Sequence, residues 1–319
     1  MHYLTRMTTH TTADVDVIIP LYNNAAYIAK AVHSVIAQTR QVDRLMIVDD
    51  GSTDHGVRIV EEIIASHQGS PRILVIQQPN RGPNAARNRG LRLSSATYVA
   101  FLDSDDVWEP SKIQEQLTLF ERAGHDLLMT YVLAYAMDQN DVRSLDPPFF
   151  LEHPLRGHIF EELLPVNLIT GSASSVMIRR SALERTGMFD EDLRGFEDID
   201  LWLRLSREGL VDVVEQPLVG LRKHPTNAQR DIRSMLREML AFYDKWFHEA
   251  WNRPKVLHMW GHLIGEFVLR ASDPREARRM VKRSTTVLQR RALFSRTFGS
   301  LDLYLILKGL RKLMHKATA

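Results

Sequence analysis

The sequence of 319 residues contains no cysteine, which excludes disulfides and thiolate metal sites and fits a reducing compartment. It also lacks any run of the roughly 18 apolar residues that a membrane-spanning helix needs. The nearest candidate, Leu301 to Leu307, is far too short. Residues 1–13 lack the apolar core of a secretory signal, so we expect a disordered tail there. These absences predict a cytoplasmic protein, either soluble or peripheral on the inner face of the cytoplasmic membrane.

The chain also lacks a large net charge, but its total of +2 is unevenly distributed along the sequence. From Ala271 to the end, 12 Lys or Arg stand against 3 Asp or Glu, a net charge of +9. Ser300 to Lys316 has leucines at helical spacing among basic residues, which is typical of a helix that binds an anionic membrane surface. The alternative is a helix that packs on its own domain or on a second subunit of a homo-oligomer. The basic residues lack an interleaved aromatic platform or a known nucleic-acid-binding module, so nucleic acid is not the expected partner.

Short apolar, β-branched runs alternate with helical patterns in the first half of the chain. This alternation predicts an α/β fold with a mostly parallel sheet flanked by helices. From about Ala228 onward the pattern is helical only, which predicts a C-terminal helical extension. The expected strands of the first half are Asp16 to Pro20, Arg44 to Val48, Arg72 to Ile76 and Tyr98 to Leu102.

Three of these strands end in side chains that suit a nucleotide. The strand from Tyr98 delivers Asp103, Asp105 and Asp106, and ligands of open α/β sheets bind at the carboxyl ends of strands. Carboxylates this close repel each other, so the pattern favours a hard cation such as Mg²⁺ or Mn²⁺. The alternative is an acidic loop that caps the helix beginning near Ser111. The first two strands add Tyr22 and Asp50, an aromatic ring and an acid that suit a nucleobase.

Five stretches in one order resemble family 2 glycosyltransferases, and together they cover roughly residues 15–225. The resemblance implies the GT-A fold over residues 14–225, followed by a helical, basic region over residues 226–319. The matching stretches are Val17-Ile-Ile-Pro-Leu-Tyr-Asn23, Ile47-Val-Asp-Asp-Gly-Ser-Thr-Asp54, Asn80-Arg-Gly-Pro-Asn-Ala-Ala-Arg-Asn88, Phe101-Leu-Asp-Ser-Asp-Asp106, and Gly187-Met-Phe-Asp190 followed by Glu197-Asp198-Ile-Asp-Leu-Trp-Leu-Arg204.

The resemblance implies a site for a nucleotide-sugar donor. Tyr22 and Asp50 would recognise the base, with the backbone of Pro20 close by. Asp105 would contact a divalent cation, Mn²⁺ or Mg²⁺, and Asp103 would contact the ribose or support the metal. A cation there takes up charge as the nucleoside diphosphate leaves.

Basic residues complete the implied donor site. Arg81 lies where the family has a contact to the nucleotide, whereas Arg87 is interpreted as a structural residue that anchors the acidic loop. Arg222 and His224 resemble a late basic motif that reaches the diphosphate or the metal. A lone histidine is also compatible with a packing or surface role.

Glu197 and Asp198 resemble the family's catalytic pair, with Asp198 as the general base that activates an acceptor hydroxyl. No covalent intermediate is needed, so the anomeric configuration would invert. The alternative is that both residues only favour the start of the following helix through its dipole.

The sequence therefore predicts a metal-dependent inverting glycosyltransferase of cell-surface polysaccharide biosynthesis. It would move one sugar from a nucleotide sugar, UDP-linked by default, to a glycan or lipid-linked acceptor. Addition of a single sugar is favoured because the Gln-x-x-Arg-Trp motif of processive synthases is absent. The alternatives are a nucleotidyltransferase, whose glycine-rich basic loop is missing after the first strand, and a protein that binds nucleotide sugars without transferring them.

Overall fold

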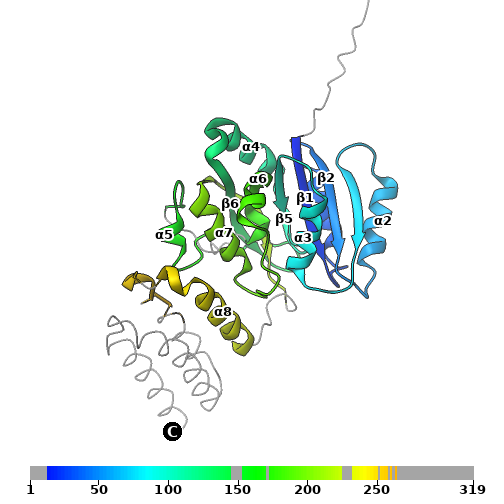
Figure 1. Cartoon of the computed structure of the whole chain (residues 1–319). Coiled ribbons are helices and arrows are strands. Elements are labelled where there is room, and N and C mark those ends of the chain that lie inside the picture. The colour runs from blue at the N-terminus through cyan, green and yellow to red at the C-terminus, as the bar shows by residue number, and fades with distance from the viewer. Residues whose placement is uncertain are drawn as a thin grey trace, which may run out of the picture. The chain divides into compact units, whose positions relative to one another are not determined.

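The computed structural model describes residues 13–144, 153–169, 172–224, 232–250, 252–257, 259–260 and 263. Figure 1 colours the chain by residue number from the N-terminus to the C-terminus. The chain divides into two compact units. The first unit takes in Met1–Ile159, Leu168–Glu191 and Arg204–His224, and the second takes in Phe160–Asn167, Asp192–Leu203 and Pro225–Ala319. The three-part division expected from the sequence stays a prediction.

The first unit is built on a mixed sheet of eight strands in the order β3-β2-β1-β4-β7-β6-β8-β5. The pairs β3–β2, β2–β1, β1–β4 and β6–β8 are parallel, and β7 runs antiparallel to both β4 and β6. The predicted α/β class is confirmed. The strands are β1 Ala13–Leu21, β2 Val42–Asp49, β3 Arg72–Gln77, β4 Tyr98–Phe101, β5 Val107–Trp108, β6 Leu127–Met137, β7 Val176–Arg179 and β8 Leu210–Arg222.

The helices α1 to α7 lie between these strands in the sequence, and α8 follows the last strand. The α-helices are α1 Ile28–Ile36, α2 Gly56–Ser66, α3 Pro83–Leu93, α4 Lys112–Ala123, α5 Phe160–Leu163, α6 Arg180–Thr186, α7 Glu197–Glu208 and α8 Ile232–Ala250, with 3₁₀ turns η1 Gly124–Asp126 and η2 Ala173–Ser175.

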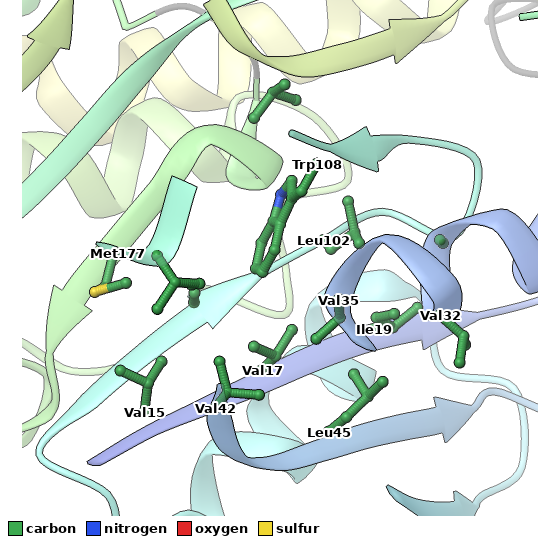
Figure 2. Close-up of a cluster of buried hydrophobic side chains, with 14 of the residues drawn as sticks. Val15, Val17, Ile19, Val32, Val35, Val42, Leu45, Leu102, Trp108 and Met177 are labelled. Atoms are coloured by element: carbon green, nitrogen blue, oxygen red, sulfur yellow. The ribbon is translucent and has the colours of Figure 1, made fainter. Parts of the chain in front are cut away.

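One face of the sheet carries the main hydrophobic core. Alternate residues of β1, among them Val15, Val17 and Ile19, point to this face, where α1 lies (Figure 2). Apolar residues of α2 and α4 belong to the same cluster. Trp108 and Met177 join the same cluster. Strand β1 is buried on both faces, so its residues from Val15 to Leu21 are all apolar apart from Asp16.

Helix α3 packs on the opposite face of β1, and Gly90 allows the approach. A Cβ atom at Gly90 would lie 2.7 Å from Ile18 Cγ2 and 2.9 Å from Ile18 Cγ1. Ile18 is fully buried and cannot move aside easily. The close packing of α3 on β1 therefore requires glycine at this position.

A Gly90→Ala variant is expected to lose about 1–2 kcal/mol of unfolding free energy, because overpacking outweighs the gain in helix propensity. Urea unfolding measures this change. The matched control is Arg89→Ala, an exposed position on the same helix. Unchanged or raised stability of Gly90→Ala would show that Ile18 and α3 separate without cost.

Strand β8 is an element that the sequence pattern did not predict. Its middle residues Glu215, Gln216 and Pro217 are exposed and interrupt the apolar pattern. The pairing with β6 shifts register around Leu133, opposite Pro217, so an irregularity accommodates the proline. The strand continues to Arg222 and delivers the late basic motif.

The second unit is helical in its described part and holds α8. The sequence pattern predicted helix there, which α8 confirms over Ile232–Ala250. The basic segment from Ala271, including the predicted membrane-binding helix Ser300 to Lys316, lies outside the described residues. Within the described parts of the chain, no helix is both long and apolar enough to cross a membrane.

Candidate functional site

The predicted donor residues of the first unit meet at one edge of the sheet. Strands β1, β2, β3 and β4 are parallel, and β6 and β8 run in the same direction because β7 is antiparallel to both β4 and β6. Their carboxyl ends therefore lie at the same edge. Tyr22 follows β1, Asp50 follows β2, Asp103 follows β4 soon after its end, and Arg222 and His224 come from the end of β8.

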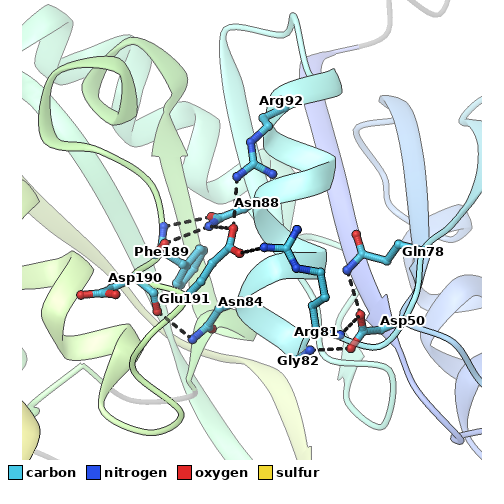
Figure 3. Close-up of polar contacts among 10 residues, drawn as sticks. All are labelled: Asp50, Gln78, Arg81, Gly82, Asn84, Asn88, Arg92, Phe189, Asp190 and Glu191. Atoms are coloured by element: carbon cyan, nitrogen blue, oxygen red, sulfur yellow. Dashed lines mark hydrogen bonds and ion pairs between the residues drawn. The ribbon is translucent and has the colours of Figure 1, made fainter.

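Asp50 is buried and its carboxylate organises the loop between β3 and α3 (Figure 3). Its Oδ1 accepts hydrogen bonds from Gln78 Nε2 at 2.8 Å and from the Arg81 backbone N–H at 2.9 Å. Its Oδ2 accepts from the Gly82 N–H at 2.7 Å. Gly82 has φ of +95°, a conformation that favours glycine. Asp50 thus already holds the loop that carries Arg81, in addition to any bond with a base.

Tyr22 and Pro20 differ in exposure. Tyr22 is 52% exposed just after the end of β1, so its side chain is accessible from solvent. Pro20 lies inside β1, is buried, and is paired with Val48 of β2. The implied contact of its backbone with a ligand stays a prediction.

The acidic loop is held at Asp103 by residues from two other elements. Arg87 of α3 is buried and donates from Nη2 to Asp103 Oδ1 at 2.7 Å. Ser172 Oγ donates to Asp103 Oδ2 at 3.3 Å, and the Asp103 N–H donates to Ser174 Oγ at 3.0 Å. The interpretation of Arg87 as the residue that anchors this loop is confirmed by its ion pair.

Asp105 and His224 form a second contact, between the acidic loop and the end of β8. His224 Nε2 lies 3.0 Å from Asp105 Oδ2. Burial and the neighbouring Asp103 carboxylate raise the pKa of Asp105 above its ordinary value, while the bond with His224 opposes the rise. Two carboxylates that repel each other at a partly buried site are the arrangement that a bound cation would stabilise.

Asp106 joins the acidic loop to two further elements. It is buried, accepts from Ser174 Oγ at 2.6 Å, and accepts from the Arg222 backbone N–H at 3.1 Å. Burial, with repulsion from Asp105 and Asp103, raises the pKa of Asp106 well above its usual value. Sequence reasoning missed Ser174, because no spacing signal connects it to the loop that it supports. In the described residues, the bonds of these carboxylates lead to Arg87, serines and β8, not to α4 as the capping alternative required.

The Arg222 guanidinium is buried and also supports the acidic loop. Its Nε donates to the Asp105 carbonyl at 2.8 Å and its Nη1 donates to the Asp138 carbonyl at 3.1 Å. Nη1 also pairs with Asp141 Oδ1 at 2.6 Å, and the guanidinium lies 4.8 Å from the centre of the Tyr27 ring. These contacts describe a residue that shapes the site, and its role toward a donor stays a prediction.

Whether a divalent cation fits this site depends on the side chains that could ligate it. Across the described ranges, no group of three or more His, Cys, Asp or Glu side chains is arranged to hold a metal alone. Mg²⁺ is commonly held by one or two carboxylates together with substrate phosphates and water. Asp103 and Asp105 offer such a pair. Burial and the neighbouring Asp103 carboxylate raise the pKa of Asp105, and a bound cation would favour its ionised form. The residues therefore fit a cation that binds together with a diphosphate.

Glu197 and Asp198 belong to the second unit and begin α7, as predicted. Glu197 is buried and Asp198 is half-buried. Contacts with α8 hold this turn. The buried Asp200 accepts from Trp246 Nε1 at 2.9 Å and pairs with Lys245 Nζ at 2.8 Å, and the Phe196 ring stacks on Phe242 with centroids 5.6 Å apart. Asp200 was not predicted as a site residue, because Trp246 and Lys245 lie more than 40 residues away in the sequence.

Comparison with known proteins shows which protein family the chain matches. The family model described as glycosyl transferase family 2 matches residues 16–187. The putative teichuronic acid biosynthesis glycosyltransferase TuaG of Bacillus subtilis is 35% identical over 198 residues, which is 61% of this chain and 73% of the relative. An uncharacterized glycosyltransferase of Rickettsia felis is 29% identical over 210 residues, 65% of this chain. The matched residues make up 33% of the length of that longer relative.

Solved structures share the fold at low sequence identity. S. aureus TarS 1–349 in complex with UDP-GlcNAc matches with a TM-score of 0.57 and 18% identity, over 82% of each chain. The mannosyltransferase PcManGT from Pyrobaculum calidifontis, in complex with GDP-Man and Mn²⁺, matches with a TM-score of 0.57 and 17% identity, over 96% of this chain and 89% of that one. The predicted GT-A type of α/β fold is confirmed by this likeness.

Proposed function

The chain belongs to glycosyl transferase family 2, and from that premise we propose that it moves one sugar from a nucleoside diphosphate sugar to an acceptor hydroxyl. The observation that carries this proposal is the common edge at which Tyr22, Asp50, Asp103 and Asp105 follow parallel strands. An aromatic ring and an acid suit the base, and paired carboxylates suit a cation on the diphosphate. The structural neighbours named above were solved with UDP-GlcNAc and with GDP-Man and Mn²⁺, which supports a donor of this class.

In the proposed reaction, Tyr22 stacks on the base and Asp50 accepts from its ring nitrogen. Asp105, with Asp103, would hold a divalent cation, and a cation there neutralises charge on the departing nucleoside diphosphate. Asp198 takes the proton of the acceptor hydroxyl as that oxygen attacks the anomeric carbon. The bond from this carbon to the diphosphate oxygen breaks in the same step, so the configuration inverts.

The identities of base, sugar and acceptor belong to the proposal. UDP is the default nucleotide, and a glycan or a lipid-linked saccharide of cell-surface polysaccharide is the default acceptor. Peripheral attachment of the basic segment 271–319 to an anionic membrane would bring the enzyme to a lipid-linked acceptor. A chain ending at Ser272 that bound anionic vesicles as well as the full chain does would contradict that attachment.

Calorimetric titration with UDP, GDP, dTDP and CDP, each with and without Mn²⁺, tests the proposal. We expect one of these nucleotides to bind tightly, and to do so only when Mn²⁺ is present. The nucleotide that binds identifies the base of the donor, so only sugars carried by that nucleoside diphosphate then need to be tested. Binding of none by the folded protein would mean that the carboxylates of Asp103 and Asp105 are structural and that the proposed function is wrong.

A further inference from the structure

Ser174 contacts the acidic loop, Asp103 to Asp106, at both of its ends, although none of the five motif stretches includes this serine. Its Oγ accepts from the Asp103 backbone N–H at 3.0 Å and donates to Asp106 Oδ2 at 2.6 Å. The loop also closes on itself, because the Asp106 N–H donates to the Asp103 carbonyl at 3.0 Å. One buried hydroxyl therefore fixes both ends of the turn that contains Asp105.

The pairing of β7 with β4 explains why Ser174 lies opposite Asp103. In this antiparallel pair Ala100 is the partner of Met177, so each step forward along β4 corresponds to a step backward along β7. Three further steps lead to Asp103 on one segment and to Ser174 on the other, and the hydrogen bond between them shows that they meet. The register of the sheet thus determines where the hydroxyl lies.

The backbone of Ser174 is held from a second side by Trp108. The indole Nε1 donates to the Ser174 carbonyl at 2.8 Å. The Trp108 ring belongs to the hydrophobic core (Figure 2), and Lys112 Nζ lies 4.0 Å from its centre. Because strand pairing and the indole both restrain Ser174, it is a rigid support for the acidic loop.

Ser172 adds a further contact from an unusual backbone conformation. Its φ is +53° and its ψ is −159°, a combination that in proteins is essentially confined to glycine. From this position its Oγ donates to Asp103 Oδ2 at 3.3 Å and accepts from the Ser174 N–H at 3.4 Å. Residues held in such a conformation cost stability and cluster at functional sites. The contacts that a glycine here would lose are those of this hydroxyl.

The acids that these serines hold differ in exposure. The side chains of Asp103 and Asp105 are 26% and 18% exposed. Asp106 is only 5% exposed, and both of its carboxylate oxygens accept hydrogen bonds. Asp106 therefore holds the loop, while Asp103 and Asp105 are the carboxylates that a ligand can reach. Two carboxylates bind one cation well when the groups around them fix their positions in advance.

We propose that Ser174 is a positioning residue for the divalent cation of the donor, which holds Asp103 and Asp105 in place through the turn that joins them. The proposal rests on the proposed function, because it takes a cation bound together with a nucleoside diphosphate as the ligand. Ser174 is fully buried and acts through the acids, not as a ligand. Groups that support metal ligands in this way typically contribute about 10- to 100-fold to metal affinity.

The test compares Ser174→Ala with the matched control Ser94→Ala. Ser94 Oγ also donates to a buried carboxylate at 2.6 Å, that of Asp16 in the first half of β1, away from the carboxyl-end edge. Calorimetry measures binding of UDP, GDP, dTDP or CDP, whichever the wild type binds, with and without Mn²⁺. Urea unfolding should show lower stability in both variants, because each leaves a buried carboxylate with one donor fewer.

Only Ser174→Ala should lose affinity that depends on the metal. With Mn²⁺ present, it is expected to bind the nucleotide about 10-fold more weakly than the wild type does. Without Mn²⁺, its affinity should change by less than about twofold, since the base-binding residues are distant from the change. Ser94→Ala should bind as the wild type does under both conditions, which separates loss of positioning from general loss of stability.

Ser172→Gly provides a second test, which applies if Ser174→Ala does not fold. Glycine adopts a φ of +53° without strain, so this variant should be as stable toward urea as the wild type or more stable. It removes a hydroxyl from Asp103, so affinity in Mn²⁺ should fall about 3- to 10-fold. Lower metal-dependent affinity without lower stability is a result that a merely structural role does not produce.

Three outcomes would overturn the inference. They are wild-type affinity in Mn²⁺ for the folded serine variant, equal losses with and without Mn²⁺, and a loss in Ser94→Ala as large as that in Ser174→Ala. If the wild type binds no nucleotide at all, the proposed function fails and the inference fails with it. Any of the three outcomes on a wild type that binds nucleotide with Mn²⁺ leaves the proposed function standing.

Discussion

An Asp198→Asn variant is expected to lose about 10²- to 10⁴-fold in kcat, the usual contribution of a general base. Donor affinity should stay near that of the wild type, because a base acts in the transition state and contributes little to binding of the donor. Asn keeps the size and hydrogen-bonding capacity of the side chain in the first turn of α7, so the fold should survive. Initial rates with saturating donor, together with calorimetric binding of the nucleotide, measure the two effects separately.

Asp192→Asn serves as the control for this experiment, because Asp192 is exposed and lies six residues earlier. It should transfer sugar at the wild-type rate. A loss of donor affinity as large as the loss of kcat in Asp198→Asn would show that Asp198 binds the donor, and the assignment of the base would then be wrong.

The strands of the parallel half were predictable because burial on both faces requires β-branched and apolar residues in sequence. The exact ends of these strands were not predictable. Strand β1 begins at Ala13, three residues before the predicted start, and contains the fully buried Asp16. That carboxylate pairs with Arg44 of β2 and accepts from Ser94 Oγ at 2.6 Å. Partners this distant in sequence leave no local signal that a polar residue belongs inside a strand.

Strand β8 shows the same limit more strongly. Its pairing with β6 bends around exposed residues Glu215 to Pro217, so its pattern resembles two short runs divided by a turn. Arg222 and His224 were singled out only because they resemble a late basic motif of the family. Only the sheet shows that β8 runs parallel to β6 and so brings Arg222 to the acidic loop.

The candidate site was predictable where strand ends supplied the residues, and not where other elements held them. Asp50, Asp103 and Asp105 were identified correctly as neighbours of one edge of the sheet, although their roles toward a ligand stay predictions. Ser174 was missed, because its hydroxyl reaches the loop from a turn some 70 residues later, as its 2.6 Å bond to Asp106 shows.

Asp105→Asn is expected to weaken metal-dependent binding of the nucleoside diphosphate by about 10²-fold, because an amide is a poor substitute for a carboxylate ligand of a hard cation. Binding measured without metal should change little. Calorimetric titration with the nucleotide, with and without Mn²⁺, checks both statements. The control is Asp43→Asn, an exposed carboxylate of β2 that is 54% accessible. Equal affinity of the variant and the wild type in Mn²⁺ would remove Asp105 from the metal site.

The same substitution should leave the protein as stable as the wild type or more stable at neutral pH. The pKa of Asp105 is raised in the folded protein, so its ionised form is less favourable there than in the unfolded chain. The ionised carboxylate therefore lowers the free energy of unfolding at any pH above the folded pKa. Below the unfolded pKa of about 3.8 the carboxyl is protonated in both states, and the cost disappears. Thermal unfolding at neutral pH and near pH 3 should therefore show a stability advantage of Asn only at the higher pH. A variant that lost stability at neutral pH would mean that the contact with His224 outweighs the repulsion from Asp103. A gain in stability with a loss of binding would instead mean that the protein keeps an unfavourable charge at this position for the sake of its ligand.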